Sequence, residues 1–235
     1  MKRLCSVCAR GGSKGVPNKN IRPLLGKPLL IYSLDQARQS DLFDCIVVSS
    51  DSKEILQLAE EWGVDHAIER PEELATDFAA KIPVFQHCFQ TAETLSGMTF
   101  DTAVDLDATS PLRNQDDLKG VVDLLESHDS TTNVITGTTA RRSPYFNLVE
   151  LDESGRVYLS GKRSNIDGSI VRRQDAPPCF DMNASIYAWW RESLLNTTDH
   201  VIQFGTRLYL MPEERSVDID SELDFRWVEF LMNNE

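Results

Sequence analysis

The sequence predicts an α/β fold with a doubly wound, mostly parallel sheet, and two observations support this. Short apolar runs typical of buried strands alternate with amphipathic runs of helical period along most of the 235 residues. A basic, glycine-rich loop follows the first apolar run, at the carboxyl end of the strand, where open α/β sheets bind their ligands. We therefore expect one domain over residues 1–235, with its site at the carboxyl edge of the sheet.

The first half of the chain carries the regular alternation. Four apolar runs predict strands at 4–9, 45–49, 64–69 and 102–106. Helix signals fall between and after these runs. They predict a helix that begins near Pro28, one opened by a capping pair of Asp51 and Glu54 and stopped by Gly63, one over 78–95 with Pro83 near its first turn, and one over 115–125.

The pattern changes in the second half. Strands are expected at 133–136, 184–189 and 208–211, and a final helix at 222–231. Residues 140–181 instead form a hairpin-like stretch, with strands at 145–149 and 156–159, and then a loop rich in Arg, Asn and Gly. We interpret 140–181 as a small β-containing insertion. Its six cations suggest an anionic partner such as a carboxylate: Arg141, Arg142, Lys162, Arg163, Arg172 and Arg173.

Composition narrows the class of protein. A formal net charge of −13 argues against general binding of nucleic acid, which needs a wide basic face. No apolar run approaches the roughly 18 residues that span a bilayer, and no signal-peptide pattern follows Met1, so we expect no membrane partner and a cytoplasmic location. The five cysteines mostly lie in apolar runs, as buried thiols do, and the Cys5-x-x-Cys8 spacing has no second pair to complete a metal site.

The loop over residues 9–20, Ala-Arg-Gly-Gly-Ser-Lys-Gly-Val-Pro-Asn-Lys-Asn, predicts a triphosphate site. Glycine permits close approach and positive φ, so that several N–H groups can face one anion. Arg10, Lys14 and Lys19 add positive charge to match the roughly four negative charges of a triphosphate. The spacing fits neither a Walker loop nor a dinucleotide fingerprint, which disfavours ATPase and NAD-dependent functions.

Ser216-Val-Asp-Ile-Asp220 predicts a second part of the site. If this segment is a strand, Asp218 and Asp220 share one face and the apolar residues between them pack on the other. Two carboxylates suit Mg²⁺, which takes one or two carboxylates together with phosphate oxygens. The alternatives are a helix cap at Asp220 or two solvated charges. Beside a triphosphate loop, the metal site is favoured.

Two arginines, Arg70 and Arg113, are expected in loops at the same edge of the sheet. Each is either a site residue or an ordinary surface charge. The four histidines are scattered and none accompanies a Ser or Cys nucleophile motif, so a triad hydrolase has little support.

In order along the chain, these motifs resemble those of one family, the CMP-sialic acid synthetases, also called acylneuraminate cytidylyltransferases. The resemblance covers nearly the whole chain, and the related 2-keto-3-deoxy-octulosonate enzymes usually carry a Tyr-Gly-Ser-x-Arg-x-Pro-type loop that is absent here. It implies a Rossmann-like nucleotidyltransferase fold and the reaction of CTP with a nine-carbon 2-keto sugar acid to give the CMP-sugar and pyrophosphate. The motifs that carry it are 9–20, 26–28, 49–52, 70–75, 109–113, 183–187 and 216–220.

The resemblance also implies roles for individual residues. Lys14 would stabilise the charge that develops on the leaving pyrophosphate. Asp218 and Asp220 would hold Mg²⁺ or another divalent cation, and Asp218 or a metal-bound hydroxide would be the general base. Arg173 and Gln174 would bind the sugar, on an insertion that resembles the family's dimerisation arm, so the expected assembly is a homodimer with shared active sites. The expected nucleotide-binding residues are Arg10, Gly12, Ser13, Lys19, Asn20 and Arg70.

Two departures from the sialic acid members resemble the legionaminic acid branch of the family. Many sialic acid members have Gln-Pro where this chain has Asp107-Ala108, and a serine cluster where it has Ala79-Ala80-Lys81. The hypothesis is that Asp107 binds the sugar by accepting from an acetamido N–H that neuraminate lacks at C7. The favoured substrate is therefore N,N'-diacetyllegionaminate. The alternatives are N-acetylneuraminate in the same reaction, and a nucleotide-binding protein without turnover.

Overall fold

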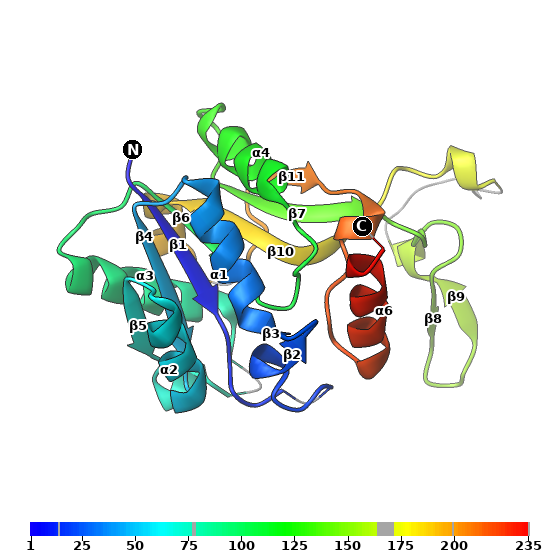
Figure 1. Ribbon diagram of the computed structural model, residues 1–235. Coiled ribbons are helices and arrows are strands. Elements are labelled where there is room, and N and C mark those ends of the chain that lie inside the picture. The colour runs from blue at the N-terminus through cyan, green and yellow to red at the C-terminus, as the bar shows by residue number, and fades with distance from the viewer. Residues whose placement is uncertain (14, 77–78, 164–171, 199, 235) are drawn as a thin grey trace.

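The computed structural model describes residues 1–13, 15–76, 79–163, 172–198 and 200–234. In this part of the chain, seven strands form one sheet in the order β11-β7-β10-β6-β1-β4-β5 (Figure 1). The order places β1 inside the sheet, between β6 and β4, so the loop that follows β1 leaves from an interior strand at the carboxyl edge. The seven strands are β1 (Arg3–Cys8), β4 (Cys45–Ser50), β5 (His66–Glu69), β6 (Thr102–Leu106), β7 (Asn133–Thr139), β10 (Phe180–Trp190) and β11 (Thr206–Leu210).

Four of the strand pairs are parallel, which confirms the predicted mostly parallel sheet: β1 with β4 and β6, β4 with β5, and β7 with β11. Strand β10 runs antiparallel to both β6 and β7. Its direction follows from the insertion, because the chain leaves β7 at the carboxyl edge and comes back to the sheet from that same edge. The sequence pattern of β10 predicts a strand but contains no signal for its direction.

Helices cover both faces of the sheet (Figure 1). One core cluster packs α1, α2 and α4 against side chains such as Cys5 and Val7 of β1, and the other packs α3 and α5 against Leu4. Alternate residues of one strand thus enter opposite cores, as expected for a sheet buried on both faces. The helices are α1 (Leu29–Ser40), α2 (Lys53–Trp62), α3 (Lys81–Ser96), α4 (Gln115–Glu126), α5 (Arg191–Asn196) and α6 (Glu222–Met232).

Two helices start differently from the prediction. Helix α2 is capped by Ser52, whose side chain accepts from the Ile55 N–H at 3.4 Å, whereas Asp51 accepts from the Gly11 N–H at 2.9 Å. The predicted capping pair is therefore wrong, because Asp51 anchors the opening loop. Helix α3 begins at Lys81 and not at residue 78.

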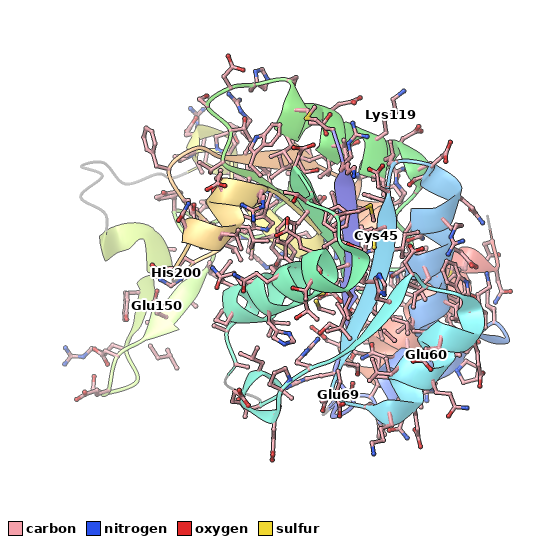
Figure 2. All side chains as sticks on the ribbon, turned by 90° about the vertical axis from the view of Figure 1, so that its left-hand side faces the viewer. Cys45, Glu60, Glu69, Lys119, Glu150 and His200 are labelled. Atoms are coloured by element: carbon pink, nitrogen blue, oxygen red, sulfur yellow. The ribbon has the colours of Figure 1, made fainter. Side chains whose placement is uncertain are left out.

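The insertion contains a separate two-stranded sheet of β8 (Val149–Leu151) and β9 (Val157–Leu159). Strand β8 starts later than predicted, because the carbonyl of Ser143 accepts from the N–H groups of residues 146–148 and holds that segment in a turn. The hairpin, with Glu150, projects from the body of the protein (Figures 1 and 2). No helix of the described residues is long and apolar enough to cross a membrane.

A third, smaller core lies under the carboxyl edge of the sheet. It joins Val16 of the opening loop and Leu24 of a short hairpin, β2 (Pro23–Leu24) with β3 (Lys27–Pro28), to Ile219 and to Phe225 of α6. All four side chains are buried. This core brings the C-terminal segment against the opening loop, about 200 residues earlier in the chain.

Candidate active site

The opening loop follows β1 and is fixed by its neighbours. The Ala9 N–H donates to the Ser49 carbonyl at 3.0 Å, and the amide of Asn20 donates to the Arg10 carbonyl at 2.9 Å. Asn20 is buried, and among the described residues nothing bonds its Oδ1 atom. A buried amide oxygen without a partner is costly, so Oδ1 is available to a hydrogen-bond donor on a ligand.

Close approach, not positive φ, explains the glycines of this loop. A Cβ atom on Gly15 would collide with the carbonyl oxygen of Asp220, so the loop touches the C-terminal segment there through its backbone. Among the described residues of the loop, Asn18 has a positive φ, at 52°, whereas Gly11 and Gly12 do not. The predicted use of positive φ by these glycines is therefore wrong, and the predicted close approach occurs to the protein's own backbone.

The segment 216–220 is not a strand, contrary to the prediction. Among the described residues, the Ile219 N–H donates to the distant Thr109 carbonyl at 2.9 Å, whereas the Ser216 N–H donates locally to the Glu213 carbonyl at 3.1 Å, so no ladder forms. The predicted alternation nevertheless holds, because Ile219 is fully buried while Asp218 and Asp220 line the cleft. The cap of α6 is Ser221, which removes the alternative role of Asp220 as that cap.

Lys19 joins the loop to these carboxylates. Its ammonium donates to the Ile219 carbonyl and lies 3.1 Å from Asp220 Oδ1. Burial, and then the charge of Asp220, raise the pKa of Asp218 above its ordinary value. A cation would stabilise a carboxylate whose proton affinity is raised by a neighbouring carboxylate, so the donor chemistry of Asp218 and Asp220 fits a divalent ion that also binds phosphate oxygens.

Arg70 and Arg113 are both buried, so neither is an ordinary surface charge. Arg70 donates to the carbonyl of Ser49 at 2.8 Å and lines the cleft. Arg113 donates to the carbonyls of Ser185 and Asp107, each at 2.8 Å, and to the hydroxyl of Ser33. Burial lowers the pKa of Arg113 to about 10. Arg113 therefore braces the loop behind the cleft and does not line it.

Asp107 is held from two sides. Its Oδ1 accepts from the N–H and the hydroxyl of Thr109, at 3.0 and 2.8 Å, and its Oδ2 lies 3.5 Å from the ammonium of Lys81. Burial raises its pKa, but Lys81 and the Thr109 bonds lower it by more, so the carboxyl is ionised more readily than usual. The neighbouring Asp105 is buried and accepts from the Ser6 hydroxyl at 2.6 Å; burial raises its pKa to about 6.

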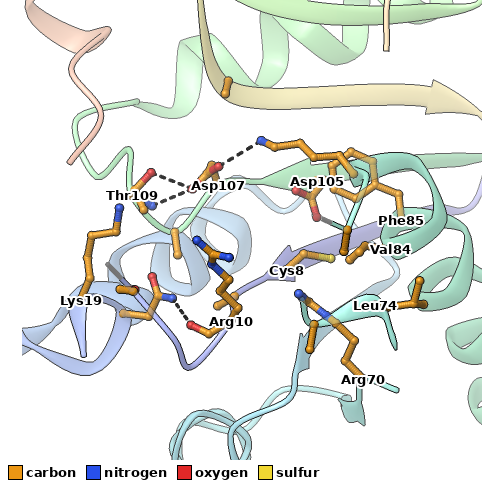
Figure 3. A pocket seen from close by; sticks show the side chains of 18 of the residues that line it. Cys8, Arg10, Lys19, Arg70, Leu74, Val84, Phe85, Asp105, Asp107 and Thr109 are labelled. Atoms are coloured by element: carbon orange, nitrogen blue, oxygen red, sulfur yellow. Dashed lines mark hydrogen bonds and ion pairs between the residues drawn. The ribbon is translucent and has the colours of Figure 1, made fainter. Parts of the chain in front are cut away.

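These residues line one cleft of about 620 Å³ at the carboxyl edge of the sheet (Figure 3). In Figure 3, Lys19 and Phe85 lie at opposite sides of the cleft, with Arg10 and Asp107 between them. The cleft brings together most of the predicted nucleotide, metal and sugar residues: Arg10, Ser13, Lys19, Asn20, Arg70, Asp107, Asp218 and Asp220.

Four predicted site residues are not placed in the cleft. Lys14 lies outside the described residues. Gly12 is exposed, and a Cβ atom there would meet nothing within 4 Å, so the protein itself does not require glycine at this position. Arg173 and Gln174 are exposed in a short turn of the insertion (Arg173–Asp175), away from the cleft-lining set of this single chain. The roles of all four stay predictions.

Sequence reasoning did not assign Lys81 and Asp105 to the site, although both line the cleft. The signal for Lys81 was present, since it is one of the departures from the serine cluster of the sialic acid members. Asp105 is the last polar residue inside the apolar run of β6, and an ionisable residue within a buried strand is a signal in itself.

Comparisons with known proteins show which family this chain resembles. Residues 4–167 match the family model described as Cytidylyltransferase. The chain is 44% identical to "Post-translational flagellin modification protein B" of Campylobacter coli, over 99% of this chain and 95% of that protein. It is also 44% identical to "CMP-N,N'-diacetyllegionaminic acid synthase" of Campylobacter jejuni, over 98% of this chain and 94% of that protein.

More distant similarity extends to sialic acid enzymes and to a solved structure. The chain is 31% identical to the "N-acylneuraminate cytidylyltransferase" of Escherichia coli O18:K1:H7, over 95% of this chain and 50% of that protein. The structure of CMP:2-keto-3-deoxy-manno-octonic acid synthetase complexed with CTP superposes with a TM-score of 0.70, over 100% of this chain and 99% of that one, at 17% identity. At that identity the superposition shows a shared fold.

Proposed function

The chain belongs to the cytidylyltransferase family, as its motifs predict, and we propose that it activates a nine-carbon 2-keto sugar acid by transferring CMP from CTP. The products are the CMP-sugar and pyrophosphate. One observation carries the proposal: a single cleft gathers the cations of the opening loop and a pair of carboxylates about 200 residues away, with Lys19 3.1 Å from Asp220. A triphosphate with a divalent cation needs both kinds of charge in one place.

The chemical step is attack by the anomeric hydroxyl of the sugar on the α-phosphorus of CTP. A new O–P bond forms, the bond to the β-phosphate oxygen breaks, and the hydroxyl proton passes to a base. Positioning and charge neutralisation supply most of the rate in such transfers. Arg10 and Lys19 bind phosphates. The Oδ1 atom of Asn20, which has no hydrogen-bond partner among the described residues, accepts a hydrogen bond from the nucleoside. Lys14 stabilises the negative charge that develops on the leaving pyrophosphate.

Asp218 and Asp220 are the residues that would hold Mg²⁺ or another divalent cation. When bound, the ion neutralises charge on the α-phosphate and lowers the pKa of the attacking hydroxyl. The support is the donor set: both carboxylates line the cleft beside the phosphate-binding cations. Asp218, whose pKa is raised by burial and by Asp220, is also the candidate base for the hydroxyl proton.

The proposed sugar is N,N'-diacetyllegionaminate. The support is the 44% identity to the synthase of that compound, against 31% to an enzyme named for N-acylneuraminate, together with Asp107 in the cleft. N-acetylneuraminate in the same reaction is the second candidate. A cytoplasmic setting, where CTP is available and the five cysteines stay reduced, is part of the proposal.

A homodimer with shared active sites is also part of the proposal. The insertion and the adjoining end of β10 expose large apolar side chains, which a second copy of this chain would bury. Arg173 and Gln174 lie on this insertion, away from the cleft of their own chain, so they would serve the partner's site. The exposed apolar residues are Leu148, Val149, Leu151, Val157, Phe180 and Met182.

Pyrophosphate release tests the proposed reaction. We expect release with CTP, Mg²⁺ and N,N'-diacetyllegionaminate, slower release with N-acetylneuraminate, and loss of release on chelation of the metal. ATP, GTP and UTP serve as matched nucleotide controls. No release with any nine-carbon 2-keto acid would contradict the proposal.

Mixing two inactive variants tests the shared site. If Arg173 serves the partner's cleft, equal amounts of Arg173→Ala and Asp218→Asn chains form heterodimers in which one of the two sites is intact. Random exchange should then restore roughly a quarter of the wild-type rate. Sedimentation of the wild-type chain as a monomer, or no restoration after exchange, would contradict the shared-site proposal.

A further inference from the structure

We propose that Lys81 determines which sugar is used, by donating a hydrogen bond to the carbonyl oxygen of the acetamido group at C7 of the substrate. The inference rests on the proposed function and deepens it, because it assigns the choice of sugar to the Lys81–Asp107 pair and not to Asp107 alone. Four features of the cleft lead to it: the fixed geometry of Asp107, the charge balance of the pair, the apolar surface beside it, and a matched pair elsewhere in the fold.

The first feature is the orientation of Asp107. Because Thr109 donates two hydrogen bonds to Oδ1, the carboxylate is fixed with Oδ2 toward Lys81. The ammonium lies 3.5 Å from Asp107 and also donates to the Tyr187 hydroxyl at 3.5 Å. Both contacts are long and an ammonium has three protons, so a proton remains for another acceptor. About half of the Lys81 side chain is exposed, and it lines the cleft.

The second feature is the charge of the pair. Lys81 is paired with Asp107, and its ammonium also lies 4.8 Å above the ring centre of Tyr187. Partial burial lowers the pKa of Lys81, but Asp107 and Tyr187 raise it by more, so the ammonium stays protonated. A pair with no net charge favours a neutral dipolar group over a carboxylate, because Asp107 repels a second anion. An amide carbonyl is such a group.

The third feature is the apolar surface beside the ammonium. Lys81 is the first residue of α3, and Val84 and Phe85 follow three and four positions later, on the same side of the helix. Both line the cleft (Figure 3). An acetamido group carries a methyl next to its carbonyl, so it would place the methyl against this surface while the oxygen accepts from Lys81. A hydroxyl group offers no methyl and a weaker acceptor.

The fourth feature supplies a control within the same protein. Lys27 pairs with Asp35 at 2.6 Å and lies 4.8 Å above the ring of Tyr32, and the other carboxylate oxygen of Asp35 accepts from Trp62 at 2.9 Å. The lysine side chains are 43% exposed at Lys27 and 47% at Lys81. Lys27 is not among the residues that line the cleft. The two lysines therefore share an aspartate partner, a tyrosine ring and a similar exposure, and they differ in their access to substrate and in the length of the ion pair.

The experiment compares Lys81→Met and Lys27→Met with two sugars. One is N,N'-diacetyllegionaminate, and the other is the same sugar with a hydroxyl in place of the acetamido group at C7. We expect Lys81→Met to lower kcat/KM for the first sugar about 10- to 100-fold, because a hydrogen bond from a charged donor is lost. The kcat/KM for the second sugar should change less than about 3-fold. Lys27→Met should change both sugars less than about 3-fold, and both variants should keep the wild-type KM for CTP.

Several outcomes would overturn the inference. Equal losses with both sugars would mean that Lys81 contacts a group they share, such as the carboxylate, and a raised KM for CTP would place it at the nucleotide. If Lys81→Met fails to fold, Lys81→Ala, which also lacks a donor, gives the same test with the same pair of sugars. Failure of the proposed function is distinguishable, since it appears in the wild-type protein as no pyrophosphate release with either sugar.

Discussion

The two ends of the cleft are built in different ways. At the end with Lys19, backbone groups and charges from remote segments meet at contact distance, as at Gly15 and Asp220. At the end with Phe85, the Lys81–Asp107 ion pair lies beside apolar side chains of α3. The first arrangement suits the triphosphate, which every reaction of this enzyme shares. The second suits a variable substituent. Substitutions at the first end should affect all sugars alike, and substitutions at the second should change the preference between sugars.

The largest expected effect is at the shared end. Asp218→Asn should lower kcat/KM about 1,000-fold with every sugar, because it removes the carboxylate that we propose binds the cation and accepts the proton. Pyrophosphate release with two sugars measures this. Glu214→Gln, an exposed substitution in the same segment, is the control and should be near wild type. A loss of kcat/KM with one sugar only would contradict the proposed difference between the two ends of the cleft.

Lys19→Met should have the next largest effect. The ammonium lies 3.1 Å from Asp220 and is proposed to bind a phosphate, so its loss should raise the KM for CTP about 10- to 100-fold, whichever sugar is present. Initial rates at varied CTP measure it, with exposed Lys53→Met as the matched control. An unchanged KM for CTP would remove Lys19 from the nucleotide end.

A smaller, selective effect is expected at the variable end. Asp107→Gln should lower the preference for the acetamido sugar about 10-fold, because Lys81 loses its partner and the N–H of the substituent loses an acceptor. The ratio of kcat/KM values for the two sugars measures this preference. If the ratio does not move, Asp107 is not a selector.

The smallest effect on activity is expected from Asp105→Asn. This substitution tests how much the buried Asp105 carboxyl at the variable end lowers the free energy of unfolding. The pKa of Asp105 is raised from 3.8 to about 6, so the folded state holds its proton more tightly than the unfolded state. Stability contributed by the protonated carboxyl is therefore present below about pH 4 and lost as pH rises to about 6. Asp105→Asn should remove this slope and stabilise the protein at pH 7 by up to about 3 kcal/mol.

Urea unfolding at pH 4, 5, 6 and 7 measures this difference. The wild-type protein should lose stability relative to Asp105→Asn across that range. Parallel pH profiles of the two proteins would show that the Asp105 carboxyl titrates alike in both states, contrary to its burial beneath the cleft.

The shared end was largely predictable from sequence, and the reason is physical. Close backbone contacts and paired charges impose fixed residue types at fixed spacings, so the loop at 9–20 and the Ser216–Asp220 motif stand out. At the variable end the sequence predicted Asp107 but not its pairing with Lys81, because the two residues are 26 positions apart and only the fold brings them together. The direction of β10 and the non-strand state of 216–220 were missed for a similar reason, since alternation of side chains does not reveal which backbone groups find partners.

The central claim is that the phosphorus attacked is the α-phosphorus of CTP. Turnover of N,N'-diacetyllegionaminate with CTP labelled at either the α- or the γ-phosphorus tests it directly. The account predicts that the α label appears in the sugar nucleotide and that the γ label leaves only in pyrophosphate. Release of the γ label as inorganic phosphate, or its appearance on the sugar, would contradict the account.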